Sequence, residues 1–273
     1  MNKELLGKHI ISNCIQVMRI AAEASSHANA GVQEINGSLR YFSGCQFPFF
    51  NGVFNNYQHK DAVLKDDLTE ITDYFSEKNV PFIWWWLQDS EMPSEIKNEL
   101  DQKGFKFLGD FTGIAVQLTQ INKNTFMPDK TVKIKQVETS AEYQQFIAIL
   151  CEVFQMTDSI KKEMKEMLKS YGPDGKFKHY LGFYKDKAVA TATSYIDGNI
   201  VGLYNGATLT EARNKGLCSV LAKKVIDDAI LLGCEYGITQ LMASAMAKGI
   251  AEKLGAKKYC NLLPYIKEPN TAS

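Results

Sequence analysis

The residue types that most clearly predict a binding chemistry stand together in Arg213-Asn214-Lys215-Gly216-Leu217-Cys218. This segment follows an apolar run that ends at Ala207-Thr208-Leu209, and a helical pattern comes after it. The first amides of a helix have no partner within the helix, and with the positive end of the helix dipole they favour a phosphate. Gly216 lets an anion approach the backbone closely, while Arg213 and Lys215 add positive charge. The segment therefore predicts a phosphate or pyrophosphate site, of neither the Walker nor the dinucleotide-fingerprint type.

Regular elements on both sides would position this segment. Residues 199–209 predict a strand, and apolar residues repeated every four positions predict a helix over 217–229. A further strand is predicted at 236–243, and the helix that follows it would stop at Gly255. Earlier in this half, Thr139-Ser140-Ala141-Glu142 matches a capping box and so predicts another helix start. Strands and helices thus flank the loop throughout the second half.

With these elements in place, the second half resembles the GNAT superfamily of acyl-CoA-dependent N-acyltransferases. The best-known signature of that superfamily is [Gln/Arg]-x-x-Gly-x-[Gly/Ala], and Arg213, Gly216 and Cys218 stand at its three defined positions. Cys218 departs from it, because the last position is usually a smaller residue. Glu252-Lys253-Leu254-Gly255 is similar to the end of a later helix in the family, and the resemblance covers roughly residues 132–266. It implies an α/β fold with a mixed sheet: tandem GNAT folds, of which only the second keeps the coenzyme A loop.

The resemblance also implies which residues bind acetyl-CoA, the expected co-substrate, and it implies no metal. Arg213 and the backbone amides that follow it would hold the pyrophosphate, and the edge of the preceding strand would pair with the pantetheine. Two residues of the later helix region would line the thioester end. The implied cofactor-binding residues are Ala207, Thr208, Leu209, Arg213, Asn214, Lys215, Gly216, Leu217, Cys218, Ser244 and Ala247.

The catalytic residues are less clearly indicated. In the family, an amine attacks the acetyl thioester directly, a backbone N–H polarises the carbonyl group, and a donor protonates the departing thiolate. The usual donor is a tyrosine four residues before the closing glycine, where this sequence has Ala251. Three other residues are candidate donors, each with a structural alternative as strand residue, helix cap and core residue respectively: Tyr204, Ser244 and Tyr259.

Two further questions about the chemistry stay open. The carboxylates nearest to the loop or to the expected acceptor-side helices are Glu211, Glu152 and Asp158, and none is singled out as the general base. Cys218 suggests a covalent acyl-enzyme as an alternative, because a helix N-terminus lowers the pKa of a thiol. No histidine stands near Cys218 in the sequence, and the family needs no such intermediate.

The first half predicts a related but degenerate domain. Residues 4–24 and 64–75 carry helical apolar patterns, and Val80–Leu87, with three consecutive tryptophans, predicts a strand at the centre of a sheet. The polar stretch 119–125 predicts the connection, so we expect a degenerate GNAT-like domain over residues 1–125 and a GNAT acetyltransferase domain over residues 130–273. The first half lacks any Arg-x-x-Gly loop, so its expected role is structural or acceptor-binding, with the acceptor between the halves.

The charge and composition of the chain limit the classes of partner that it is expected to bind. The 273 residues carry 31 Lys+Arg and 31 Asp+Glu, with a pI near 6.9, which gives no electrostatic basis for binding nucleic acid or an anionic membrane. The first fourteen residues lack a secretory pattern, and the longest apolar run has eight residues, so we expect a cytoplasmic protein. The six cysteines form no Cys-x-x-Cys pair and are expected to be free thiols, and the scattered histidines predict no zinc site.

The resemblance implies an N-acetyltransferase that moves an acetyl or short acyl group from acetyl-CoA to an amine. The acceptor class stays open between a small-molecule amine and a peptide or protein amine. One alternative is a non-catalytic acyl-CoA-binding or sensing protein, suggested by Ala251. Another is a transferase that takes an aminoacyl group from tRNA, which the neutral charge and the retained pyrophosphate loop disfavour.

Overall fold

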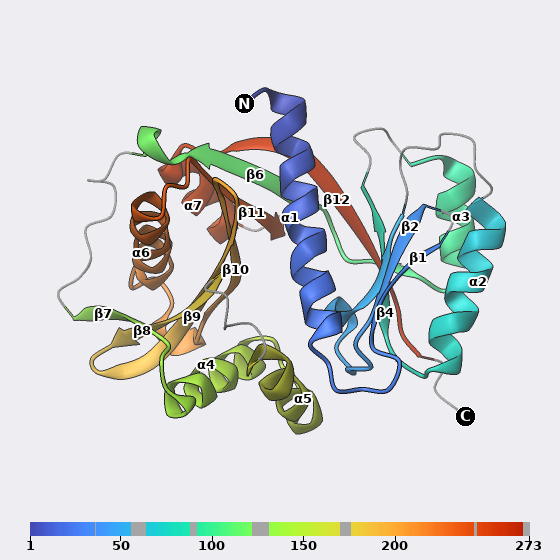
Figure 1. The fold of residues 1–273 in the computed structure, drawn as a ribbon, viewed down its shortest axis with the longest axis horizontal. Coiled ribbons are helices and arrows are strands. Elements are labelled where there is room, and N and C mark those ends of the chain that lie inside the picture. Colours follow the sequence, from blue (N-terminus) through green and yellow to red (C-terminus); the bar gives the residue numbers. More distant parts are fainter. Residues whose placement is uncertain are drawn as a thin grey trace.

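One mixed sheet organises the molecule (Figure 1). The computed structural model describes residues 1–35, 37–55, 64–87, 92–121, 131–169, 176–242 and 245–269. Its described strands form a 12-stranded sheet in the order β1-β2-β3-β4-β12-β6-β11-β10-β9-β8-β7, with β5 paired to β12. The strands are β1 Gly31–Ile35, β2 Ser38–Phe42, β3 Asn51–Phe54, β4 Phe82–Trp86, β5 Lys106–Phe107, β6 Phe111–Gln117, β7 Val132–Gln136, β8 Phe177–Tyr184, β9 Lys187–Asp197, β10 Ile200–Thr208, β11 Tyr236–Met242 and β12 Lys257–Lys267.

The described residues include seven α-helices. Helices α2 and α3 cover the first-half strands on the right of Figure 1, and α6 lies against β8, β9 and β10 on the left. Short 3-10 turns in the described part of the chain are η1 Pro48–Phe50, η2 Leu118–Gln120 and η4 Thr210–Ala212. The helices are α1 Lys3–Glu23, α2 Leu64–Glu77, α3 Ser94–Gln102, α4 Ser140–Val153, α5 Asp158–Lys169, α6 Leu217–Leu231 and α7 Ala245–Leu254.

The two halves repeat one strand–helix unit. In the first half the order is β3-α2-β4-α3-β5, and in the second it is β10-α6-β11-α7-β12. Each unit holds a parallel pair, β3 with β4 and β10 with β11, whereas the other described pairs are antiparallel. Each ends in a short helix, a left-handed glycine and a strand, with Gly104 at φ 76° and Gly255 at φ 68°. The predicted mixed α/β fold is confirmed.

The halves also exchange strands. Strand β6 belongs to the first half of the sequence, yet it lies between β11 and β12 and pairs with both. Strand β12, at the end of the sequence, pairs with β6 over its first part and with β4 and β5 over its second part. The domain boundary predicted between residues 125 and 130 falls outside the described residues and stays a prediction.

Helix α1 joins the cores of both halves. Its N-cap Asn2 accepts a hydrogen bond from the Leu5 amide at 2.8 Å, and it packs on β1, β6 and β12. Ile10 lies in an apolar cluster with residues of β11 and β12, whereas Val17 lies in the core formed by α4, α6 and the second-half strands. Figure 1 shows α1 standing between the two groups of strands.

The tryptophan run is core, as predicted. Trp84, Trp85 and Trp86 are 2%, 2% and 3% exposed on strand β4. Trp84 and Trp86 face the α2 and α3 side, and Trp85 faces the α1 side. The Trp85 indole donates to the Tyr41 hydroxyl at 2.9 Å, which satisfies its buried N–H.

Periodicity predicted the long elements better than the short ones. The helices predicted at 4–24 and 217–229 are confirmed as α1 and α6, and the strand predicted at 199–209 is confirmed as β10. Strands β1, β2, β3, β6 and β7 were not predicted; all but β6 have five residues or fewer, too few for periodicity to distinguish a strand. No described helix combines the length and apolar character that crossing a membrane requires.

The strand exchange predicts that the halves need one another to fold. A fragment of residues 131–273 lacks β6, so the facing edges of β11 and β12 would have no hydrogen-bond partner. We expect fragments 1–121 and 131–273, expressed separately, to aggregate or lack a cooperative thermal transition in circular dichroism. Co-expressed, they should co-purify as one folded complex. A cooperative transition for either fragment alone would contradict this expectation.

Candidate functional site

The parallel pair β10 and β11 separates after three residues. Residues 200–202 pair with 236–238, and beyond them β10 continues beside β9 while β11 continues beside β6. Residues 203–208 and 239–242 therefore form two diverging arms, called the fork below. Across its base, the Thr239 hydroxyl donates to the Leu203 carbonyl at 2.9 Å. Beyond this bond the two facing edges have no backbone partner among the described residues, an arrangement with which an extended ligand can pair.

In the part of the first half that the structure describes, the corresponding strands form no fork. Strands β3 and β4 stay paired over residues 52–54 and 83–85, and the Asn55 amide then donates to the Trp85 carbonyl at 3.3 Å. The Asn55 amide therefore continues the pairing just past the end of β3. A backbone site of the kind seen between β10 and β11 is confined to the second half within the described residues.

The predicted phosphate loop lies directly after the β10 arm. Gly216 is the N-cap of α6 in the left-handed conformation, at φ 78°, and it forms no side-chain cap. Asn214 is also left-handed, at φ 62°. The Val220 amide bonds the Gly216 carbonyl at 3.1 Å, but among the described residues no acceptor meets the amides at 217–219. This turn leaves the first amides of α6 without a partner among the described residues, as an anion site requires.

Cations stand beside these donors. Arg213, Asn214 and Lys215 are exposed, and Arg213 Nε donates to the Thr208 carbonyl at 3.4 Å. That bond ties the loop to the end of β10. The loop therefore lies next to the end of the β10 arm.

A bulge interrupts β10 inside the fork. Tyr204 pairs with Thr193 and Ala207 with Thr191, so β10 has one more residue than β9 between these pairs. Asn205, within the bulge, adopts φ 51°, which is uncommon for a residue with a side chain. A bulge turns backbone groups out of the regular ladder. The sequence analysis missed it.

Tyr204 lies beside the bulge, and its hydroxyl is held by helix α1. The hydroxyl donates to Asn13 Oδ1 at 2.6 Å, and Asn13 is only 1% exposed. Burial raises the pKa of Tyr204 well above its usual value, although a hydrogen bond with Gln240 acts in the opposite direction. Gln240, on the other arm, donates to the Ile10 carbonyl at 3.2 Å. Polar bonds therefore tie α1 to both arms, a contact the sequence analysis did not predict.

Comparison with known proteins identifies the fold that has this geometry. No protein-family model and no curated protein matches the sequence. A solved structure of a GCN5-related N-acetyltransferase from Kribbella flavida matches 96% of both chains at 13% identity, with a TM-score of 0.66. A tandem GNAT protein from the clavulanic acid biosynthesis pathway matches 97% of both chains at 8% identity, with a TM-score of 0.58. The chain has the GNAT fold.

A third similar structure carries no activity in its description. It is a conserved protein of unknown function from Staphylococcus epidermidis, 11% identical, with a TM-score of 0.69 over 87% of this chain and 93% of that one. Identities this low establish the fold alone. The likeness to a tandem GNAT protein over the whole length agrees with the repeated unit of β3 to β5 and β10 to β12.

Within the GNAT fold, the other predicted donors are placed as follows. Tyr259 is partly buried in an irregularity of β12, and β6 and β11 stand between β12 and β10. Tyr259 therefore lies apart from the β10 arm. Ser244 falls outside the described residues, and Ala247 lies on α7, where its side chain is not described. Of the three candidate donors, the structure brings Tyr204 to the fork.

The predicted carboxylates are exposed. Glu211 pairs with Lys187 at 3.3 Å, and its pKa is lowered by a hydrogen bond to its own backbone amide and by Lys187. Glu152 and Asp158 are exposed on α4 and α5. The described residues include no group of histidine, cysteine and acidic side chains that could hold a metal ion. The structure therefore singles out no general base among the three carboxylates.

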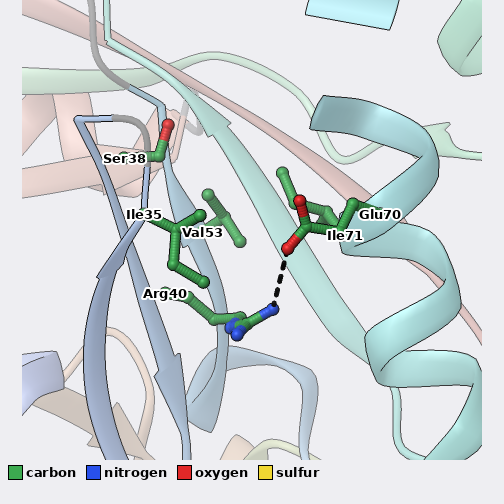
Figure 2. Close-up of a pocket in the computed structure, with 6 residues that line it drawn as sticks. All are labelled: Ile35, Ser38, Arg40, Val53, Glu70 and Ile71. Carbon is green, nitrogen blue, oxygen red and sulfur yellow. Dashed lines mark ion pairs between the residues drawn. The ribbon is translucent and has the colours of Figure 1, made fainter. Parts of the chain in front are cut away.

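A small hollow in the first half is distinct from the fork. Figure 2 shows Arg40 of β2 directed toward Glu70 of α2, with 4.0 Å between Nη1 and Oε1. The Arg40 guanidinium also stacks on the Tyr74 ring at 3.6 Å. The hollow faces α2, on the opposite side of the first-half strands from α1. It is lined by Ile35, Ser38, Arg40, Val53, Glu70 and Ile71.

The packing at the base of the fork predicts a sensitive glycine. A Cβ on Gly202 would overlap Asn13 Oδ1 and lie 2.6 Å from Tyr204 Cε2. We expect Gly202→Ala to lower the free energy of unfolding by about 1–3 kcal/mol in denaturant titration. Gly206→Ala, where a Cβ meets nothing within 4 Å, is the control and should have a smaller effect. Adding Asn13→Ala to Gly202→Ala should restore part of the loss, and a fully stable Gly202→Ala would refute the described packing.

The environment of Cys218 predicts low reactivity. All six cysteines are free, five are buried, and burial raises the pKa of the half-buried Cys218. The helix N-terminus does not produce the lowered pKa that a covalent acyl-enzyme needs. We expect alkylation by iodoacetamide to be slow at pH 7 and to accelerate as the pH rises above the usual thiol range. Intact-mass spectra after incubation with acetyl-CoA should show no acylated protein, and an adduct absent from Cys218→Ala would reverse this conclusion.

Proposed function

We propose that the second half binds acetyl-CoA, or a short acyl-CoA, and transfers the acyl group to an amine. The observation that carries this proposal is the continuity of the open fork with the Gly216 turn, whose amides at 217–219 have no acceptor among the described residues. One surface thus offers an unpaired strand edge followed by an anion site. Acyl-CoA has the matching order, with amide groups in the pantetheine arm followed by a pyrophosphate.

Binding would use the chain's backbone more than its side chains. The amides at 217–219 would donate to the pyrophosphate, with Arg213 and Lys215 adding charge. The free edge of β10 at residues 207–209 would pair with the pantetheine amides as an added strand. This mode tolerates Cys218 at the last signature position, because Cys218 contributes its backbone amide.

The proposed reaction is direct attack. The amine lone pair attacks the thioester carbonyl carbon, a C–N bond forms, the C–S bond breaks, and the departing thiolate takes up a proton. The bulge at Asn205 and Gly206 would supply a backbone N–H to the carbonyl oxygen. Tyr204 is the candidate proton donor because it stands beside the bulge in the fork; to serve, its hydroxyl would turn its proton from Asn13 Oδ1 to the thiolate.

The acceptor is proposed to be a small-molecule, peptide or protein amine bound between the halves, in a cytoplasmic protein. Helix α1 contacts η1 and α5 as well as both fork arms, so first-half residues lie beside the reacting position. The first half would then shape the acceptor site while the second half holds the acyl-CoA.

Acetyl-CoA binding is the first test. Acetyl-CoA at about 100 times its dissociation constant should stabilise the protein by about 2.7 kcal/mol, which raises the melting temperature by roughly 5 °C. Gly216→Ala and Gly198→Ala both place a side chain at positive φ, 78° and 58°, where a Cβ meets nothing within 4 Å. Each should cost about 1–2 kcal/mol of stability. Only Gly216→Ala should also weaken acetyl-CoA binding, and no shift in the wild type would refute the proposal.

A sensor without catalysis is the second candidate. It is favoured by Ala251, which stands on α7 where the family's usual proton donor would be. Steady-state release of thiol from acetyl-CoA with any amine in a panel would exclude the sensor. A thermal shift with no thiol release from that panel would favour it.

A further inference from the structure

Three polar side chains are buried directly behind the β10 bulge. Thr191 and Thr193 are each 1% exposed on β9, and His179 is 6% exposed on β8. Buried polar groups cost free energy unless they are hydrogen-bonded, and apolar residues of similar size would fill the same core at lower cost. The hydrogen bonds of these three residues therefore indicate what they are used for.

Two of those bonds hold Asn205. The Thr191 hydroxyl donates to the Asn205 backbone carbonyl at 2.8 Å. Asn205 Nδ2 in turn donates to Thr193 Oγ1 at 3.1 Å. Asn205 is the left-handed residue of the bulge, so its backbone and its side chain are each fixed by one threonine. Without these bonds, a side-chain-bearing residue at φ 51° would favour return to an ordinary strand conformation.

His179 supports the second threonine. Its Nδ1 lies 2.8 Å from Thr193 Oγ1, and its Nε2 lies 3.1 Å from the Tyr143 hydroxyl on α4. The Tyr143 and Phe146 rings pack against the imidazole at centroid distances of 5.3 and 4.9 Å. Burial lowers the pKa of His179 to about 4, so the ring is neutral near pH 7 and has one N–H.

The hydrogen bonds of Thr193 indicate which nitrogen of His179 carries the proton. Thr193 Oγ1 already accepts from Asn205, and its own proton has no acceptor among the described residues other than His179 Nδ1. Nδ1 is then the acceptor, and Nε2 carries the proton and donates to the Tyr143 hydroxyl oxygen. The hydrogen bonds then run in one direction, from Asn205 to Thr193, from Thr193 to His179 and from His179 to Tyr143.

We propose that Thr191, Thr193 and His179 are positioning residues that hold the β10 bulge in the conformation needed for acyl transfer. The inference rests on the proposed function, in which a bulge amide polarises the thioester carbonyl. None of the three lies on β10 or β11. They act through Asn205, by fixing the direction in which the amides of Asn205 and Gly206 point. A displacement of a catalytic donor by about 1 Å is enough to slow an enzyme about 100-fold.

The test is a matched pair at Thr193. Thr193→Val keeps the shape and removes the hydroxyl, whereas Thr193→Ser keeps the hydroxyl. We expect Thr193→Val to lower kcat for thiol release about 10–100-fold with little change in KM for acetyl-CoA, and Thr193→Ser to keep most of the activity. Ser194→Ala, which removes the neighbouring buried hydroxyl of β9, is the control and should leave kcat nearly unchanged.

A measurement independent of activity accompanies the kinetics. The 15N shifts of His179 should show an Nε2–H tautomer in the wild type and in Thr193→Ser, and a change in Thr193→Val. Thr193→Val with wild-type kcat, or Thr193→Ser as impaired as Thr193→Val, would overturn the proposal. An Nδ1–H tautomer in the wild type would overturn it too. A wild type that binds acetyl-CoA but releases no thiol refutes the proposed transferase instead, and the catalytic role of these residues with it.

Discussion

The site depends on the end of the parallel ladder between β10 and β11. Backbone N–H and C=O groups need partners, and a strand pair that separates inside a sheet leaves both facing edges without them. Here the ladder stops after residues 200–202 and 236–238, although both strands continue. The bulge at Asn205 interrupts the β10 ladder, and the left-handed turn at Gly216 leaves further amides at the start of α6 without a partner among the described residues. The proposed binding of acyl-CoA depends on these backbone groups.

Holding such a fork open requires support from outside the second half. Helix α1 supplies it with two polar bonds, Asn13 to Tyr204 on one arm and Gln240 to the Ile10 carbonyl on the other. The exchange of β6 and β12 fixes the position of α1 relative to the fork, because α1 packs on both exchanged strands. The position of the fork therefore depends on its contacts with α1 and on the exchanged strands. A duplication in which each half folded separately would not place a first-half helix there.

The sequence predicted the loop and the long elements because their signals are local. A few neighbouring residues are enough to recognise Gly216, Arg213 and the apolar repeat of α6. The structure places these features together. The strand exchange and the contact of Asn13 with Tyr204 join residues far apart in the chain, and no periodicity encodes such pairs. The bulge was also missed, although Asn205-Gly206 inside a predicted strand is a local signal for one, because Asn tolerates the left-handed region and Gly interrupts a strand.

The contrast between the halves explains why one chain keeps two copies of a similar unit. In the first half, Asn55 bonds Trp85 where the fork would open, and apolar rings fill both faces of β4. Aromatic packing on both faces of β4 stabilises the first half. The second half instead has buried threonines and a buried histidine in its core, which cost free energy unless they are hydrogen-bonded. Because α1 and the exchanged strands join the two halves, the apolar core of the first half helps to offset the cost of the polar groups buried in the second.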